Sequence, residues 1–417
     1  MAAEIARFDI DAPAVMVRGV VHRRVLRSSE EYLSASGPMR IERSLYSSRA
    51  KGERTICPMY LRAGVVGGRW TPLAAKQAAW VVGQMTPYGG EELFRRMGGM
   101  SPSKSSLDRL PKEISERWEG NRMEFERLLR EGEDVPATAT AVMASLDGVM
   151  VPLKDGGKRE KRARAKTEGK MASGPAGFGE AGCGTVTFFD KAGERLRTIR
   201  WAPMPEKNKA TLRDILIGEV TTAPVGRPDL KLVKVADGVE DNWNFLSREL
   251  PAGEEAVDFP HAVENMQKGL VAAYGEKSPA GEAQFRKLRH LLRDDANGVE
   301  KVIRALIHLR DKHPRRTKLA NALKYFRTHR HRMHYAELKS KNLPIGSGVT
   351  EAACKTLATQ RLRRSGMKWG EDGGQAVLTL RSLAQSDRFD RGWRLVHGTY
   401  CADVVAHDVT TAKRRAA

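Results

Sequence analysis

The sequence predicts an α/β protein, in which a mixed sheet core follows a helical region and is interrupted by a block of helices. Three observations predict this architecture. Short helical segments separated by glycines occupy residues 71–118, and apolar runs with strand character recur between residues 141 and 262. Residues 263–339 are helical and polar and carry no strand signal. The remaining helices and strands follow from local patterns along the chain.

The composition favours a partner with many negative charges. The 417 residues include 72 Lys and Arg against 51 Asp and Glu, a formal net charge of +21. Such an excess favours nucleic acid over an anionic membrane. The hydrophobic content of 41% is that of a folded protein and excludes a disordered basic chain.

The cysteines and the apolar runs bear on the compartment. The four cysteines are scattered and show no C-x-x-C pair, which argues against a zinc site and favours a reducing cytoplasm. The N-terminal segment carries acids and lacks the apolar stretch of a signal peptide. Because no run approaches the roughly 18 apolar residues of a membrane span, we expect no membrane association.

The first 138 residues predict a DNA-binding region. Residues 40–46 and 54–61 are expected to pair as a short β-hairpin. Residues 71–138 are expected to be helical, and a helix that starts near Ser101 has a polar, serine-rich first turn. A helix-turn-helix of this kind suits reading of the DNA major groove, the alternative being a plain helical bundle. The candidate DNA contacts are Lys104, Ser105, Ser106 and Arg109.

Two aspartates stand out in the strand-like region. Asp147 lies in the middle of the apolar run 141–153, where strands rarely carry Asp and a lone buried carboxylate is costly. The alternative is a hairpin turn at Asp147 and Gly148. Asp237 closes the run 230–238 ahead of a helix, a usual position for functional residues in α/β proteins.

The order of the elements predicts the topology of the core. Three strands at 141–153, 184–189 and 195–201 precede a helix, a strand, a helix, a short strand and a helix. This is the order of the ribonuclease-H-like fold, in which the first and fourth strands are neighbours. The expected domains are an N-terminal region with a hairpin (1–70), a helical DNA-binding region (71–138), the first part of the core (139–262), an all-α insertion (263–340), the last part of the core (341–395) and a basic tail (396–417).

A third acid begins a helix after the insertion. Ser347 or Thr350 is expected to cap this helix, and Glu351 lies in its first turn. A purely structural role would also explain an acid at this position. The carboxylate of Glu351 would interact favourably with the helix dipole, and it could pair with Lys355 four residues further along. Packed across the first and fourth strands, the helix would bring Glu351 to Asp147 and Asp237. Three such carboxylates suit two Mg²⁺ or Mn²⁺ ions, the arrangement used in phosphodiester chemistry.

Basic segments near these acids are candidate DNA contacts. The dense run within 154–170 is usually a solvated loop, but beside an acidic site it could clamp a DNA backbone. The histidine- and arginine-rich stretch 329–334 is interpreted as part of a basic helix facing nucleic acid rather than as a metal site. The candidate contacts are Lys158, Arg159, Lys161 and Arg162 in the dense run, and Lys355, Arg361, Arg363, Arg364, Lys368 and Trp369 after Glu351.

The ordered motifs resemble those of a family. Leu146-Asp147-Gly148, Ala236-Asp237-Gly238, Ile345-Gly346-Ser347-Gly348 through Glu351, and Ser365-Gly366-Met367-Lys368-Trp369 look like the blocks of a bacterial insertion-sequence DDE transposase of the Kra type, with a more distant likeness to Mutator-type enzymes. The resemblance spans about residues 40–395, and its last two blocks are the most specific.

The resemblance implies an activity and its partners. It implies a cytoplasmic, nucleoid-associated bacterial enzyme with a ribonuclease-H-like core. It also implies that Asp147, Asp237 and Glu351 bind the metal ions. The substrates would be terminal inverted repeats, cut with metal, and target DNA, attacked by the freed 3′-hydroxyl. A homo-oligomer on paired ends is the usual form of such enzymes. The competing readings are a structure-specific metal-dependent nuclease and a DNA-binding regulator derived from an inactive transposase.

One part of the sequence departs from the family. Asp258 and His261 fall where Mutator-type relatives carry a Cys-x-x-His pair, and Asp replaces Cys here. Their auxiliary role is therefore open. Three auxiliary roles are open: the pair orders the site, assists DNA strand separation or pins the insertion. The alternative is that His261 is a structural histidine.

Overall fold

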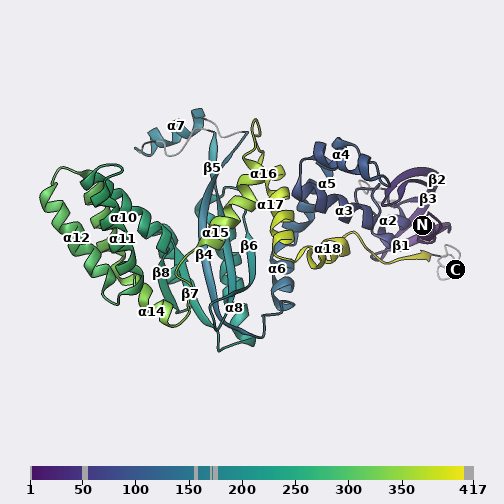
Figure 1. Cartoon of the computed structure of the whole chain (residues 1–417). Coiled ribbons are helices and arrows are strands. Elements are labelled where there is room, and N and C mark those ends of the chain that lie inside the picture. Colours follow the sequence, from purple (N-terminus) through teal and green to yellow (C-terminus); the bar gives the residue numbers. More distant parts are fainter. Residues whose placement is uncertain (1, 49–54, 155–157, 170, 172–176, 408–417) are drawn as a thin grey trace. The chain divides into compact units, whose positions relative to one another are not determined.

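The computed structural model describes the chain except for residues 1, 49–54, 155–157, 170, 172–176 and 408–417. It divides into two compact units, one formed by Met1–Leu129 with Glu371–Ala417 and the other by Arg130–Gly370 (Figure 1). Within the described residues, no helix combines the length and the apolar character that a bilayer crossing needs.

The first unit contains an antiparallel sheet of order β3-β2-β1-β9. The expected hairpin is wrong in its partner, because β3 pairs with the long preceding strand. Among the described residues 55–61, Ile56 forms an isolated bridge with Tyr46 of β3. Pro58 instead starts helix α2 (Pro58–Ala63), a position that proline favours. The C-terminal strand shows that the expected tail is partly ordered. The strands are β1 (Ala14–Val17), β2 (Val20–Ser34), β3 (Gly37–Ser47) and β9 (Val404–His407).

Helices make up the rest of the first unit. Ser103 caps α5 through its side chain, as the serine-rich sequence predicts. Helix α17, which was expected to belong to the core domain, packs on α3 and α5. Its residue Leu380 joins a hydrophobic cluster with Leu107 and Trp118 of α5. The helices are α1 (Ala2–Ala6), α3 (Pro72–Gln84), α4 (Pro87–Met97), α5 (Lys104–Gly120), α6 (Arg122–Glu131, which runs to the unit boundary), α17 (Glu371–Gln385) and α18 (Phe389–Gly398).

The second unit is built on a mixed five-stranded sheet of order β6-β5-β4-β7-β8. Strand β5 pairs antiparallel with β4 and with β6, and β7 and β8 run parallel to β4. Asp147 lies within β4, paired with Cys183 on β5, so the hairpin-turn alternative is wrong. The strands are β4 (Ala139–Pro152), β5 (Phe178–Asp190), β6 (Arg195–Trp201), β7 (Lys231–Ala236) and β8 (Glu254–Val257).

Both faces of this sheet are covered, which explains the long apolar run of β4. Val142 and Ala144 join one core cluster, while Ala141 and Met143 join another, which also contains Leu343. Helices α8 (Ala210–Gly226) and α9 (Glu240–Arg248) follow β6 and β7. Because side chains alternate along a strand, odd-numbered residues of β4 face the segment that leads to Glu351.

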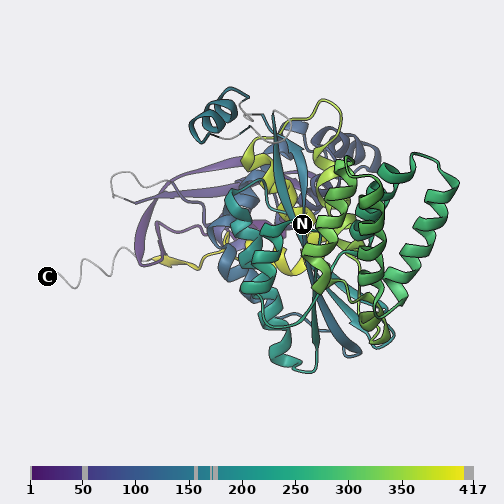
Figure 2. The same ribbon diagram turned by 90° about the vertical axis from the view of Figure 1, so that its left-hand side faces the viewer.

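The insertion forms a helical bundle beside strand β8 (Figure 1; Figure 2). The expected helix 318–338 is interrupted at residue 330. His329 is buried against Tyr325 and Arg332 bonds Glu255, so these two residues pack on the core, whereas Arg330 and His331 are exposed. The helices are α10 (Phe259–Tyr274), α11 (Pro279–Asp294), α12 (Gly298–Lys312), α13 (Thr317–His329), the 3-10 turn η2 (Arg330–Arg332) and α14 (Tyr335–Ser340).

Candidate active site

Asp147 lies within β4, and Asp237 directly follows the neighbouring parallel strand β7, which ends at Ala236. The register of these strands pairs Ser145 with Val235, so each aspartate lies two residues beyond this pair along its segment. Burial raises the pKa of Asp147; the N–H of Gly148, which donates to Oδ1 at 2.7 Å, opposes the rise, and the charge of Asp237 adds to it. The two carboxylates therefore share one region of the sheet and repel each other.

The start of α9 holds Asp237 in place. Oδ1 of Asp237 accepts hydrogen bonds from the backbone N–H of Val239 at 3.1 Å and from the side-chain amide of Asn242 at 3.2 Å. Its backbone carbonyl accepts the indole N–H of Trp243 at 2.6 Å. Arg332 from the insertion stacks on Trp243, 4.1 Å from the ring centroid. The insertion thereby supports the residue that fixes Asp237.

Glu351 lies on a short helix aimed at the same place. Helix α15 (Gly348–Ala353) continues as a π-helical turn, η3 (Cys354–Thr359), and as α16 (Gln360–Leu362); such turns are frequent at functional sites. The thiol of Cys354, one helical turn beyond Glu351, lies 3.9 Å from Oδ2 of Asp147. Burial and the charge of Asp258 raise the pKa of Glu351, and His261 opposes this rise. The charge of Asp147 also raises the pKa of Glu351, so the two carboxylates lie within electrostatic range of each other.

Asp258 is the buried link between α10 and the Glu351 helix. Its side chain is fully buried and caps α10. Oδ2 accepts the N–H of His261 at 2.9 Å and bonds Nδ1 of His261 at 2.7 Å, while Oδ1 accepts both the N–H and the hydroxyl of Ser347, the latter at 2.9 Å. Burial opposes ionisation, but these bonds outweigh it and lower the pKa of Asp258. The four bonds occupy its acceptor sites.

The cap of α15 therefore differs from the expectation. Ser347 occupies the N-cap position, but its hydroxyl bonds Asp258 rather than the helix backbone. Thr350 is buried and bonds Thr185 of β5 at 2.8 Å. These two side chains fasten the helix start to α10 and to the sheet, so the orientation of Glu351 depends on tertiary bonds.

His261 brings positive charge to the acids. Its bond to Asp258 raises the pKa of His261 to about 9 against the effect of burial, and the charges of Asp237 and Glu351 add to the rise. Its Nδ1 lies 4.0 Å from Oε1 of Glu351. The imidazole is thus cationic at neutral pH and interacts with all three predicted acids, since it also lowers the pKa of Asp147.

The acidic region contains a group that could hold a metal ion. Ligand atoms of Asp258, His261 and Glu351 lie within 4.8 Å of one another. Within the part of the chain that the structure describes, Asp147, Asp237 and Glu351 do not form such a group at that spacing. Since hydrogen bonds occupy the oxygens of Asp258, we interpret Asp258 as a residue that positions His261 and Ser347 rather than as a metal ligand. The carboxylates of Asp147, Asp237 and Glu351 fit the oxygen ligands that Mg²⁺ and Mn²⁺ prefer.

Lys209 is a site residue that the sequence analysis missed. Its amine lies 3.0 Å from Oε1 of Glu180 and donates to Oδ1 of Asn242 at 3.3 Å. Asn208 and Lys209 both have positive φ, 57° and 52°, at the 3-10 turn η1 (Lys207–Lys209) before α8. Two consecutive non-glycine residues in this region are strained, and such strain clusters at functional sites. A single lysine ahead of a helix offers no signal in the sequence.

Six of the predicted DNA contacts lie in the segment that starts at Lys355 and ends at Trp369. Lys355, Arg363, Arg364 and Lys368 are exposed, in accord with a surface role. Arg361 is buried and stacks on Trp369, with 5.0 Å between its guanidinium and the ring centroid. The backbone of Trp369 bonds the end of β4. Arg361 and Trp369 therefore tie the Glu351 helix to the sheet, which argues against a DNA contact by Arg361.

The other predicted contacts lie on α5 and on the dense basic run. Lys104, Ser105 and Arg109 are exposed, but Ser106 is buried and bonds the cap residue Ser103, which argues against a DNA contact by Ser106. The basic run, expected as a loop, forms helix α7 (Lys158–Thr167). Arg162 is exposed there, and the side chains of Lys158, Arg159 and Lys161 lie outside the described ones.

Comparisons with known proteins give little. No family model matches the chain, and no curated protein matches it. A chain of the Drosophila P element transposase strand transfer complex aligns with 79% of this chain and 82% of its own length, at 12% identity and a TM-score of 0.29. A likeness this low supports no conclusion about fold or function, so any assignment rests on the residues of the site.

Proposed function

We propose that the protein is a DDE transposase with a ribonuclease-H-like core, which binds the terminal inverted repeats of an insertion sequence, cuts them with metal and joins the freed ends to target DNA. One observation carries the proposal. Asp147 lies in β4, Asp237 directly follows the parallel strand β7, and the charge of Asp237 raises the pKa of Asp147, which supports a shared site for the two carboxylates. The strand order, the motif resemblance and the charge of +21 support it.

In this proposal the three acids hold two Mg²⁺ or Mn²⁺ ions. When bound, such ions activate a water or a 3′-hydroxyl and stabilise the leaving oxygen of an in-line displacement. Water first attacks the scissile phosphorus and the departing oxygen becomes the 3′-hydroxyl of the element. That hydroxyl then attacks a target phosphorus and releases the target's own 3′-oxygen.

The chain's other residues prepare this step. Asp258 holds His261 and the start of the Glu351 helix, and Asn242 and Trp243 hold Asp237. Lys209 brings a cation beside Asp147 and lowers its pKa. A preorganised cation of this kind stabilises charge that develops on a phosphoryl group.

Single substitutions of the acids test the proposal. Asp147→Asn, Asp237→Asn and Glu351→Gln should each abolish Mg²⁺-dependent cleavage of DNA carrying the element's ends, while binding of the same DNA is kept. Unchanged cleavage in any of these variants would remove that residue from the site.

A second assay separates the competing functions. Pre-cut ends incubated with a plasmid should yield joined products. Cleavage without joining would identify a nuclease, and binding without either reaction would identify a regulator.

A further inference from the structure

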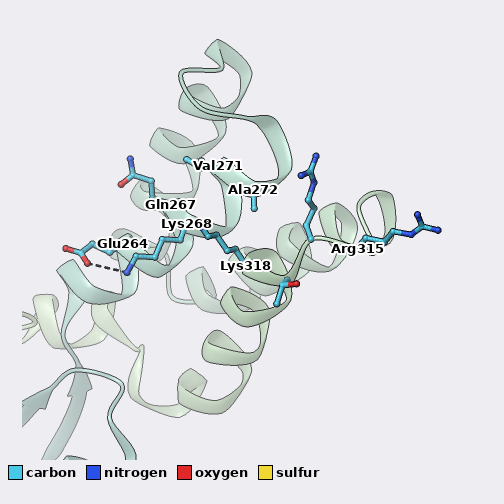
Figure 3. Close-up of a pocket in the computed structure, with 9 residues that line it drawn as sticks. Glu264, Gln267, Lys268, Val271, Ala272, Arg315 and Lys318 are labelled. Atoms are coloured by element: carbon cyan, nitrogen blue, oxygen red, sulfur yellow. Dashed lines mark ion pairs between the residues drawn. The ribbon is translucent and has the colours of Figure 1, made fainter. Parts of the chain in front are cut away.

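A groove of about 760 Å³ lies in the helical insertion, between α10 and the start of α13. Glu264, Gln267, Lys268, Val271 and Ala272 line it from α10. The other lining residues belong to the segment that starts α13, Arg315, Arg316, Thr317 and Lys318. Figure 3 shows Gln267, Lys268 and Val271 on the α10 side of the opening and Arg315 on the other side, with Lys268 paired to Glu264. Val271 and Ala272 give the groove a small apolar floor.

The charges in this groove are not balanced. Glu264 is its one acid and lies 3.8 Å from Lys268. Arg315, Arg316 and Lys318 are exposed and make no ion pair with any residue in the described part of the chain. Neighbouring like charges repel one another, so the fold gains nothing from gathering them. In a concave surface such charges focus the field and attract an anion.

The groove and the acidic site share helix α10, which carries His261 near its start and the groove residues Glu264 to Ala272 further along. His261, Glu264 and Lys268 follow at spacings of three and four residues, so they lie along one face of α10. The charge of Glu264 also acts on Glu351. Lys268 lies seven residues beyond His261, about 10 Å along the helix. This matches about three nucleotides of a duplex at ~3.4 Å each.

We propose that this groove binds the phosphate backbone of the DNA that enters the acidic site, a few nucleotides from the scissile phosphate. The ligand is a DNA duplex, held by charge and without reading of bases. Three cations on successive phosphates position the strand but carry no sequence information. The assignment of this strand to the acidic site rests on the proposed function, whereas the binding itself does not.

Salt-dependent binding of the full-length protein tests the groove. The probe is a random-sequence 40-base-pair duplex in EDTA, and the variant combines Arg315→Ala, Arg316→Ala and Lys318→Ala. Each lost phosphate contact should reduce the slope of log K against log salt by about 0.9, so we expect a total reduction of about 2–3. A wild-type slope in this variant would overturn the proposal.

A matched control removes the same charge elsewhere on the insertion. Arg286→Ala, Lys287→Ala and Arg289→Ala change three exposed residues of α11 that do not line the groove. Their combination should change the slope by less than about 1. An equal change in both variants would mean that net charge, not the groove, binds DNA. Millimolar pyrophosphate gives a further outcome. If it raises the melting temperature of the wild type but not of the groove variant, and both proteins bind the duplex with the same slope, then the ligand is a small anion and the proposal fails.

This test is separate from that of the proposed function. The assay contains no metal, so inactive acid variants should bind with the wild-type slope. If the groove variant keeps the wild-type slope while the wild type cleaves DNA, the groove proposal alone is refuted. If the groove variant has the lower slope but the wild type does not cleave DNA, the transposase assignment alone is refuted.

Discussion

The link through Asp258 leads to a quantitative prediction. In Asp258→Asn, an amide NH₂ group replaces one carboxylate oxygen, and this group donates hydrogen bonds instead of accepting them. Either the two bonds from Ser347 or the two from His261 are therefore lost. Hydrogen bonds to a charged group contribute about 1.5–3 kcal/mol each, so the local free energy of opening should fall by about 3–6 kcal/mol. Ser347→Ala removes one of these bonds, the one from its hydroxyl, and should cost about 1.5–3 kcal/mol.

Hydrogen exchange measured by mass spectrometry reads out both ends of this link. Peptides covering 255–262 and 345–352 should exchange at least about 100-fold faster in Asp258→Asn and about 10- to 100-fold faster in Ser347→Ala, since 1.4 kcal/mol corresponds to a factor of ten. Ser340→Ala, whose exposed hydroxyl bonds a backbone carbonyl of its own helix, is the control and should leave both peptides unchanged. Protection within threefold of wild type in Asp258→Asn would refute the role of Asp258 as the link.

Three further predictions follow from the contacts of the site. Lys209→Ala should slow Mg²⁺-dependent cleavage by about 10- to 100-fold with DNA binding kept, because a preorganised cation is lost; single-turnover rates measure this. Gly238→Ala should destabilise the protein by about 1–3 kcal/mol, because a Cβ there would lie 2.3 Å from Cε2 of Tyr325; thermal unfolding measures this. Mg²⁺ should raise the melting temperature of the wild type and not of Asp147→Asn, because the ion relieves repulsion between the acids.

Each of these predictions has a control and a contradicting result. Asn208→Gly keeps the lysine and should leave cleavage unchanged; an equal loss in both variants would point to backbone damage at the turn. Gly370→Ala has open space for its Cβ and should be neutral, so equal destabilisation would refute the packing at Gly238. An equal rise of the melting temperature in Asp147→Asn would place the ion elsewhere.

Local patterns determined the elements of the second unit. The five strands and most of the helices follow the predicted pattern because apolar periodicity and turn residues act over short distances. Helix α7, expected as a loop, and the interruption of the expected helix 318–338 do not follow it. Asp147 could be singled out for the same reason, since an acid inside an apolar strand must be explained by a charge partner or a ligand. The hairpin at 54–61 failed, because the pairing partner of a strand is a long-range choice that its own residues do not encode.

The placement of side chains was decided by contacts between distant segments. Asp258 and Ser347 lie 89 residues apart, and their bond orients the Glu351 helix. Arg361 appears in the sequence as one more surface cation, yet it is buried on Trp369. Lys209 becomes part of the site through two strained residues and the positions of Glu180 and Asn242. The kinds of chemical group at the site are therefore written in the sequence, but their geometry depends on packing, because hydrogen bonds and burial between remote residues select one rotamer and one register among many that local propensity permits.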